Sequence, residues 1–205
     1  MRRNQQGFTL LEVMMALTVL AIGMVGIVAL QAATIGSTQD ASQFTTANAV
    51  ARTWIQRLQR DAQRWNHPSD KVPTDDINET AWLQVADARA NQWFRPDAST
   101  VLEPGASPAF DRNGNDIDLA NVNGMRDDAV YCTHLRLRRL YPDMVRAEVR
   151  VFWKKRHLGD GVNFIKYGLA AGLCSKTGNE DELGKDTLNF HWAYTVAGIA
   201  RVTAQ

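Results

Sequence analysis

The segment Gly-Phe-Thr-Leu-Leu-Glu-Val at residues 7–13 decides the fold, because an apolar run begins within it and continues to Leu30. In residues 8–30 the only ionisable side chain is Glu12. A helix that crosses a bilayer needs about 20 apolar residues, so this stretch predicts a membrane-spanning helix. Glu12 then requires an explanation, because a charged side chain near the bilayer centre costs about 2.5–3.5 kcal/mol.

A cut after Gly7 would supply a partner for Glu12. Phe8 would then carry a free α-amine, and Glu12 follows four residues later on the same face of the helix. The amine can come from the same subunit or from a neighbour that slides past it in a lateral assembly. In a layer of low dielectric constant, such an ion pair would fix the register between subunits.

This pattern resembles the type IV prepilin signature, which combines a short basic leader, a glycine at the cleavage site, phenylalanine next and glutamate at the fifth mature position. The matching residues are Arg2 and Arg3 in the leader, then Gly7, Phe8 and Glu12. The resemblance implies cleavage between Gly7 and Phe8 by the prepilin peptidase, N-methylation of Phe8, and a role for Glu12 in assembly.

The continuation at residues 21–31, Ala-Ile-Gly-Met-Val-Gly-Ile-Val-Ala-Leu-Gln, is most similar to the minor pilins called PilV, or type IV pilus modification protein. That family implies insertion into a pilus (fimbrium) or its initiating tip complex, in pilus assembly, twitching motility or adhesion. The implied partners are other minor pilins, the major pilin and a large tip adhesin.

Two other functions stay open. A type II secretion pseudopilin of the I-type shares the same N-terminus, and a membrane-tethered periplasmic binding domain would never enter a filament. A secretory signal peptide fits less well, because its apolar core spans only about 7–15 residues. A simple anchor would leave both Glu12 and the junction of Gly7 with Phe8 unexplained.

Four segments are expected along the chain: a leader at 1–7, a transmembrane and polymerisation helix at 8–30, its amphipathic continuation at 31–65 and a head domain at 66–205. Apolar residues recur at steps of three and four up to Trp65, and no proline intervenes before Pro68. Arg2 and Arg3 precede the apolar run, which predicts a cytoplasmic N-terminus, a single pass of the inner membrane and a periplasmic head before assembly at the cell surface.

Several segments of the head alternate between apolar and polar residues, as strands do. Residues 131–137 and 145–154 alternate around the turn Tyr141-Pro142-Asp143 and predict a hairpin, and residues 188–196 predict a third strand. Residues 80–93 have helical spacing, and residues 97–128 are rich in turn formers. The expected fold is therefore α+β, with the long helix packed on an antiparallel sheet, which is also the fold that the pilin resemblance implies.

Export of the head would place its two cysteines, Cys132 and Cys174, in an oxidising compartment. In an oxidising compartment an even pair predicts a disulfide, and closing a loop of this size would stabilise the fold by about 4 kcal/mol. The alternative is two buried free thiols.

Residues 111–118 resemble a calcium loop, because oxygen-bearing side chains recur in a tight turn. The segment departs from the EF-hand pattern at Asp116, where glycine is expected, and at Val122, where glutamate is expected. A polar turn without a ligand is the alternative. The candidate ligands are Asp111, Asn113, Asn115 and Asp118.

Composition and the spacing of polar residues indicate no enzyme, and calcium is the only cofactor for which the sequence offers a candidate site. The four histidines show no zinc spacing, and no catalytic constellation appears. The net charge of +1 gives no overall basic field that would favour nucleic acid. A dense basic cluster at residues 136–156 is typical of a solvated sheet face, with an acidic partner subunit or DNA as alternatives.

Overall fold

The computed structural model describes residues 9–65, 77–96, 107–117, 129–155, 174 and 183–201, and these confirm the α+β architecture. The chain divides into two compact units, Met1–Ser42 and Gln43–Gln205. The proposed functional segments 1–7, 8–30, 31–65 and 66–205 are a different division, which stays a prediction. The elements are α1 (Leu10–Trp65), a 3-10 turn η1 (Ile77–Glu79), α2 (Val85–Ala88), β1 (Trp93–Phe94), β2 (Ala109–Phe110), β3 (Tyr131–Tyr141), β4 (Met144–Lys154) and β5 (Phe190–Ala200).

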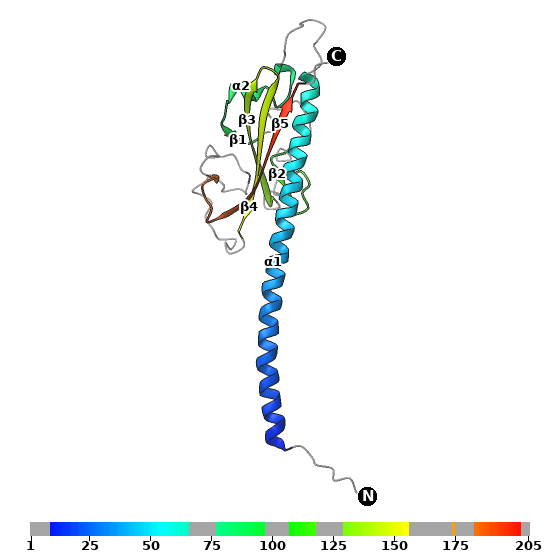
Figure 1. Ribbon diagram of the computed structural model, residues 1–205, viewed down its shortest axis with the longest axis vertical. Coiled ribbons are helices and arrows are strands. Elements are labelled where there is room, and N and C mark those ends of the chain that lie inside the picture. The colour runs from blue at the N-terminus through cyan, green and yellow to red at the C-terminus, as the bar shows by residue number, and fades with distance from the viewer. Residues whose placement is uncertain are drawn as a thin grey trace. The chain divides into compact units, whose positions relative to one another are not determined.

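The predicted continuation of the helix to Trp65 is confirmed. Within the second unit, one stripe of α1 is buried, at the three- and four-residue steps that the sequence shows. Figure 1 shows this cyan part of the helix running along the sheet. The buried apolar residues of the stripe are Ala47, Val50, Ala51, Trp54, Ile55, Leu58, Ala62 and Trp65.

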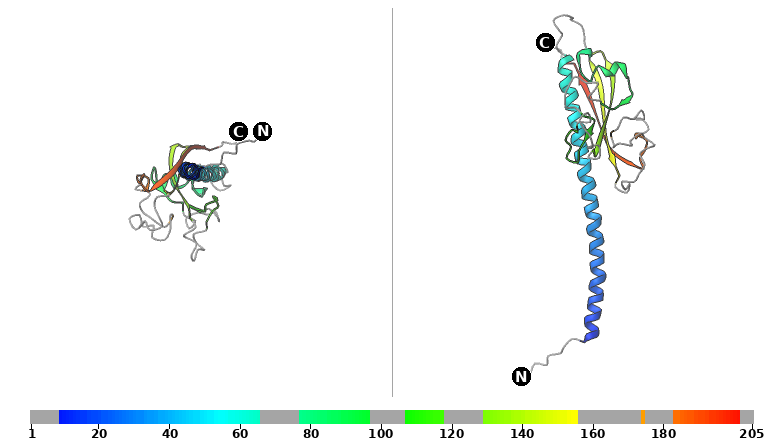
Figure 2. Two further views of the ribbon diagram at one scale, coloured as in Figure 1. Left: turned by 90° about the horizontal axis from the view of Figure 1, so that it is seen from below. Right: turned by 180° about the vertical axis from the view of Figure 1, so that it is seen from behind.

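The sheet is antiparallel and its main strands follow the order β1-β3-β4-β5, with β2 also paired to β3. The hairpin β3–β4 is the predicted one, and Leu135 pairs with Val149 at its centre. The third predicted strand is present as β5, which begins at Phe190 and extends to Ala200. Figure 2 shows, in the view from behind, the sheet lying beside the second half of α1.

Each face of the sheet buries its own apolar cluster. On the helix side, Leu135, Leu137 and Val149 pack with the buried stripe of α1. On the opposite face, a smaller cluster closes one end of the sheet. Its buried members are Ala109, Cys132, Phe152, Cys174, Leu183 and Phe190.

The helix predicted for residues 80–93 is wrong in extent, because α2 covers only four residues and Trp93 belongs to β1. The reason is a set of contacts between residues that lie far apart in the sequence. The buried carboxylate of Asp61 accepts the backbone N–H groups of Ala81, Trp82 and Leu83 at 2.7, 2.7 and 3.0 Å, which fixes a turn before α2. The helix ends at Ala88, with Arg89 as its C-cap, and Asn91 then adopts a left-handed conformation with φ of 64° before β1 begins.

In the segment 97–128, predicted to be irregular, the described residues 107–117 include a short strand, β2, which pairs with β3. Two residues are too few to give an alternation pattern, so sequence analysis could not detect it. Residues 97–106 and 118–128 lie outside the described residues, as does most of the loop predicted at 66–78.

Replacing Asp61 tests the turn before α2. We expect Asp61→Ala to lower the free energy of unfolding by about 3–5 kcal/mol, because three buried N–H groups lose a charged acceptor. Asp61→Asn keeps one acceptor oxygen and is expected to lose less. The exposed Asp87, whose carboxylate lies 3.0 Å from Arg139, supplies the control, since Asp87→Ala should cost about 1 kcal/mol or less. Urea denaturation measures all three, and equal losses for Asp61→Ala and Asp87→Ala would contradict this role for Asp61.

Candidate functional site

The first part of α1 presents apolar side chains on every face. From residue 9 to residue 42 every side chain is exposed except at Gly36, which is intermediate. Within the described residues, α1 alone is long and apolar enough to cross a membrane, as judged by length and composition. Its apolar surface needs a lipid or protein environment that the isolated chain does not provide. The large exposed apolar residues are Leu10, Leu11, Val13, Met14, Met15, Leu17, Val19, Leu20, Ile22, Met24, Val25, Ile27, Val28, Leu30 and Ile35.

Glu12 lies in the first turn of this helix, and its side chain is exposed. The hydroxyl of Thr9 accepts the backbone N–H of Glu12 at 3.3 Å, so Thr9 caps the helix. The pattern Thr-x-x-Glu before an apolar run is the sequence signal of a capping box, which the sequence analysis did not use. A carboxylate at this position also interacts favourably with the positive end of the helix dipole.

Gly7 and Phe8 lie outside the described residues. Cleavage between them, methylation of Phe8 and the ion pair of its amine with Glu12 therefore stay predictions. The structure adds that Glu12 has a second, local role, because it sits where a helix N-terminus favours an acidic residue.

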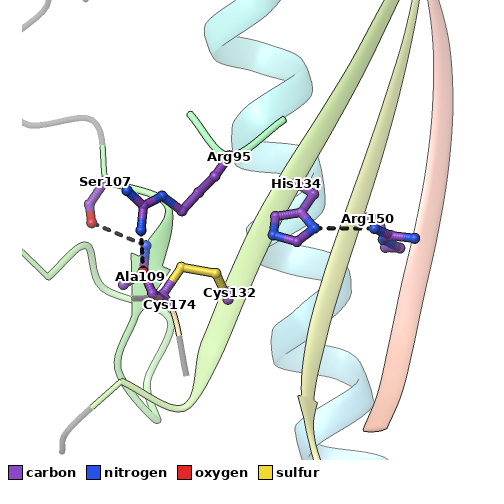
Figure 3. The surroundings of a disulfide bond; sticks show 7 residues. All are labelled: Arg95, Ser107, Ala109, Cys132, His134, Arg150 and Cys174. Atoms are coloured by element: carbon purple, nitrogen blue, oxygen red, sulfur yellow. Dashed lines mark hydrogen bonds between the residues drawn. A yellow bond between two sulfur atoms is a disulfide. The ribbon is translucent and has the colours of Figure 1, made fainter. Parts of the chain in front are cut away.

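The predicted disulfide between Cys132 and Cys174 is present, with a Cα–Cα distance of 5.4 Å and a sequence separation of 42. Both residues are buried in the apolar cluster on the sheet face opposite α1. Arg95 donates a hydrogen bond to the carbonyl oxygen of Cys174 at 2.5 Å (Figure 3). The disulfide ties residue 174 to Cys132 of β3 and closes this end of the head.

Next to the disulfide on β3 lies His134, which is buried and faces Arg150 on β4 (Figure 3). A nitrogen of the Arg150 guanidinium lies 3.1 Å from the His134 Nδ1. Burial, followed by the charges of Arg150 and Arg95, holds the pKa of His134 well below its usual 6.5. The imidazole is therefore neutral at pH 7 and acts here as a packed polar group.

Further along the same face, the carboxylate of Glu148 is held by three donors. Arg136 Nε donates at 2.7 Å, the Tyr194 hydroxyl at 2.7 Å, and Arg146 Nε lies 2.8 Å from the second oxygen. Burial opposes the charged form, but the hydrogen bonds from Tyr194 and Arg136 outweigh it and lower the pKa of Glu148. The ring of Trp93 packs against the Arg136 guanidinium, 4.7 Å from centroid to carbon.

The basic cluster predicted at residues 136–156 is thus divided by the structure. Arg136, Arg138, Arg146 and Arg150 lie on the sheet face opposite α1, while Arg139 pairs with Asp87. Lys155 donates to the carbonyl of Thr187 at 2.7 Å. Arg156 lies outside the described residues. The cluster is therefore partly a structural network and partly an exposed basic surface.

The turn predicted as a calcium loop is organised by its own first residue. Asp111 Oδ1 accepts the backbone N–H groups of Asn113 and Asn115, each at 2.8 Å, and Asn115 Nδ2 donates to Oδ2 at 3.0 Å. These bonds, led by the one from the Asn115 backbone, lower the pKa of Asp111. The arrangement is an Asx turn, in which the side chain takes the place of a backbone acceptor.

This turn also docks on α1. Gly114 has φ of +83°, and a Cβ there would lie 3.2 Å from Thr46 Cγ2, so glycine suits both the conformation and the contact. Asp116 forms an ion pair with Arg57 of α1. Asp118 lies outside the described residues, and those that are described contain no group of three or more His, Cys, Asp and Glu side chains that could hold a metal. Calcium binding by Asp111, Asn113, Asn115 and Asp118 stays a prediction.

Removing the disulfide tests its contribution to the head. We expect the double variant Cys132→Ser with Cys174→Ser to lower the free energy of unfolding by about 4 kcal/mol, because an open loop of this length gains entropy in the unfolded state. Urea denaturation of the wild type with reductant should show a similar loss. A reductant-insensitive wild type that is as stable as the double variant would contradict the prediction.

Replacing Glu148 tests the charge network. A carboxyl group with a lowered pKa in the folded state contributes stability above its unfolded pKa, near 4.5, and loses it as the pH falls through the folded value. We expect Glu148→Gln to lose about 1–2 kcal/mol at pH 7 and to be less sensitive to acid than the wild type below pH 4.5. Denaturation at pH 7 and pH 3 measures both effects, and parallel pH profiles would contradict the assignment.

Comparison with known proteins gives one match. Residues 2–28 match the family model of the prokaryotic N-terminal methylation motif. The match includes the Gly7–Phe8 junction and also Glu12. No curated protein and no solved structure matches the chain. The motif, the exposed apolar helix and the α+β head together support a type IV pilin-like protein that is anchored in a membrane.

Proposed function

We propose that this protein is a minor type IV pilin of the PilV-like kind, which takes part in initiating or capping pilus assembly. The observation that carries the proposal is the methylation motif at residues 2–28, placed on a helix whose apolar side chains are exposed from Leu10 to Ile35. Such a helix gains stability by packing against the apolar helices of other pilins. The proposed role is structural and requires no catalysis.

Glu12 supplies the register in this proposal. Paired with the amine of a mature N-terminus at Phe8, its carboxylate loses the penalty of an isolated charge in an apolar layer. Neighbouring subunits would then stop sliding where amine and carboxylate meet. The processing enzyme would be the prepilin peptidase, and the partners would be the major pilin, other minor pilins and a tip adhesin.

The choice of PilV rests on sequence alone. The pattern Ala-Ile-Gly-Met-Val-Gly at residues 21–26 and the size of the head favour it over an I-type pseudopilin of type II secretion. In either system the protein would span the inner membrane once, with its head in the periplasm, and would leave the membrane on assembly. Deletion separates the two systems, because loss of pili and twitching motility supports the pilus, whereas loss of enzyme secretion supports the pseudopilin.

Substitution of Glu12 tests the assembly role. We expect Glu12→Leu to remain in the inner-membrane fraction of the native host and to fall about tenfold or more in the sheared filament fraction, because the register ion pair is lost. Thr18→Val is the matched control, since it removes a hydroxyl that bonds the Met15 carbonyl at 2.8 Å in the same helix but changes no charge. Quantitative immunoblotting measures the amount of each variant in both fractions.

Wild-type levels of Glu12→Leu in filaments would contradict the assembly role of Glu12. Absence of the wild-type protein itself from every filament fraction would instead support the membrane-tethered binding domain.

A further inference from the structure

Strand β5 lies at the end of the described sheet, and the hydrogen-bond pattern shows which of its backbone groups face outward. The backbone N–H of Arg201 donates to the Asp143 carbonyl at 2.7 Å, and that of Lys155 donates to the Asn189 carbonyl at 3.0 Å. These two bonds lie at the ends of an unbroken register with β4. Bonded pairs alternate in an antiparallel ladder, so the odd-numbered residues of β5 bond to β4. Trp192, Tyr194, Val196, Gly198 and Ala200 therefore direct their N–H and C=O groups away from β4.

These outward groups have no backbone partner among the described residues. From residue 192 to residue 200, the described chain forms no backbone hydrogen bond outside the ladder with β4. The side chains of the outward residues lie on the face opposite α1, where Tyr194 is 46% exposed and Val196 is 44% exposed. The other side of the hairpin differs, because β1 and β2 pair with β3 there.

The edge also lacks the usual protection against strand pairing. Natural proteins protect such edges with charged side chains, proline or a bulge. Residues 192–200, Trp-Ala-Tyr-Thr-Val-Ala-Gly-Ile-Ala, contain no charged residue and no proline, and their register with β4 has no bulge. An unprotected edge of this length is a template for one more strand.

The charge beside this edge indicates what kind of strand fits. Arg146 of β4 lies directly opposite Gly198 of β5 and has a side chain that is 44% exposed. On its other side Arg146 faces the exposed Arg138 of β3, and like charges directly across a sheet are destabilising. The carboxylate of Glu148, which is only 5% exposed, binds both Arg136 and Arg146. The Arg146 side chain nevertheless stays 44% exposed, so the accessible charge here is positive.

We propose that the β5 edge binds an extended, acidic segment of another protein chain by strand addition. The backbone groups of Tyr194, Val196 and Gly198 would hold the segment. A carboxylate opposite Gly198 would reach Arg146, because strands lie about 4.8 Å apart and glycine places no side chain between them. Among the described residues, only the flexible end of Met144 lies over this glycine. The surface belongs to the head alone, so the inference holds whether or not the chain enters a filament.

Two fluorescent heptapeptides test the proposal on the full-length protein in detergent. One is capped Thr-Val-Thr-Glu-Thr-Val-Thr, and the other carries lysine in place of glutamate. By fluorescence anisotropy we expect the glutamate peptide to bind about tenfold more tightly than the lysine peptide, and Arg146→Gln to remove most of this difference. Equal affinities of the two peptides for the wild type, or no binding of either at millimolar concentration, would overturn the proposal.

A backbone variant separates strand addition from ordinary surface contact. Val196→Pro removes one outward N–H but no bond of the ladder with β4, so we expect it to weaken binding of the glutamate peptide about tenfold. Val196→Thr keeps the N–H and the branched side chain, and its affinity should stay within about threefold of the wild type. Unchanged binding by a folded Val196→Pro variant would show that the peptide does not add as a strand.

Hydrogen exchange gives a readout that needs no variant. We expect the amides of Tyr194, Val196 and Gly198 to exchange rapidly in the free protein and slowly with the glutamate peptide, while those of Ala193 and Thr195 stay slow in both. Slow exchange of the outward amides without peptide would overturn the proposal. If that protection faded on dilution, a second copy of this chain would be the occupant.

Discussion

Burial of one stripe of α1 against the sheet is the interaction on which the head depends. The stripe carries two fully buried tryptophans, Trp54 and Trp65, and the ring of Trp54 meets that of Trp82 at 5.2 Å in an edge-on contact. Buried residues of this size each contribute about 3–5 kcal/mol to folding. Asp61, on the same helix, fixes the chain around Trp82, and Arg57 and Gly114 fix the turn at residues 111–116. The helix thus supplies both the apolar surface and the polar contacts that organise the head.

The opposite face of the sheet is completed differently. One end is closed by the disulfide and its apolar cluster, and the middle holds a carboxylate bound by arginine and tyrosine side chains. Arg146, which belongs to that network, and its neighbour Arg138 are exposed, as are Tyr194 and Val196 on β5. This face therefore combines a stable interior with a surface suited to another chain, whereas the first part of α1 is suited to lipid or to other apolar helices.

Much of this architecture could be predicted from local patterns. Alternation at residues 145–154 predicted β4, and steps of three and four predicted the helix to Trp65, because one buried face imposes its period on the sequence. The pairing of Cys132 with Cys174 followed from the count of cysteines and the expected compartment. The capping role of Thr9 was also present in the sequence, as the pattern Thr-x-x-Glu.

The remaining features depend on contacts between residues far apart in the chain. Asp61 lies about twenty positions before the N–H groups that it binds, so the helical spacing at 80–93 gave too long a helix. Arg57 is 59 positions from Asp116, and no local pattern indicated that the acidic turn would dock on α1. The donors around Glu148 come from three strands. The sequence showed Arg136 and Arg146 only as members of a basic cluster, and Tyr194 only as part of a predicted strand.

The central claim is that residues 2–28 act as a prepilin processing and assembly segment. Intact mass spectrometry of the membrane-extracted protein, from cells with and without prepilin peptidase, tests it most directly. We expect a chain that begins at N-methylated Phe8 only when the peptidase is present. A chain that begins at Met1 in both kinds of cell would contradict it.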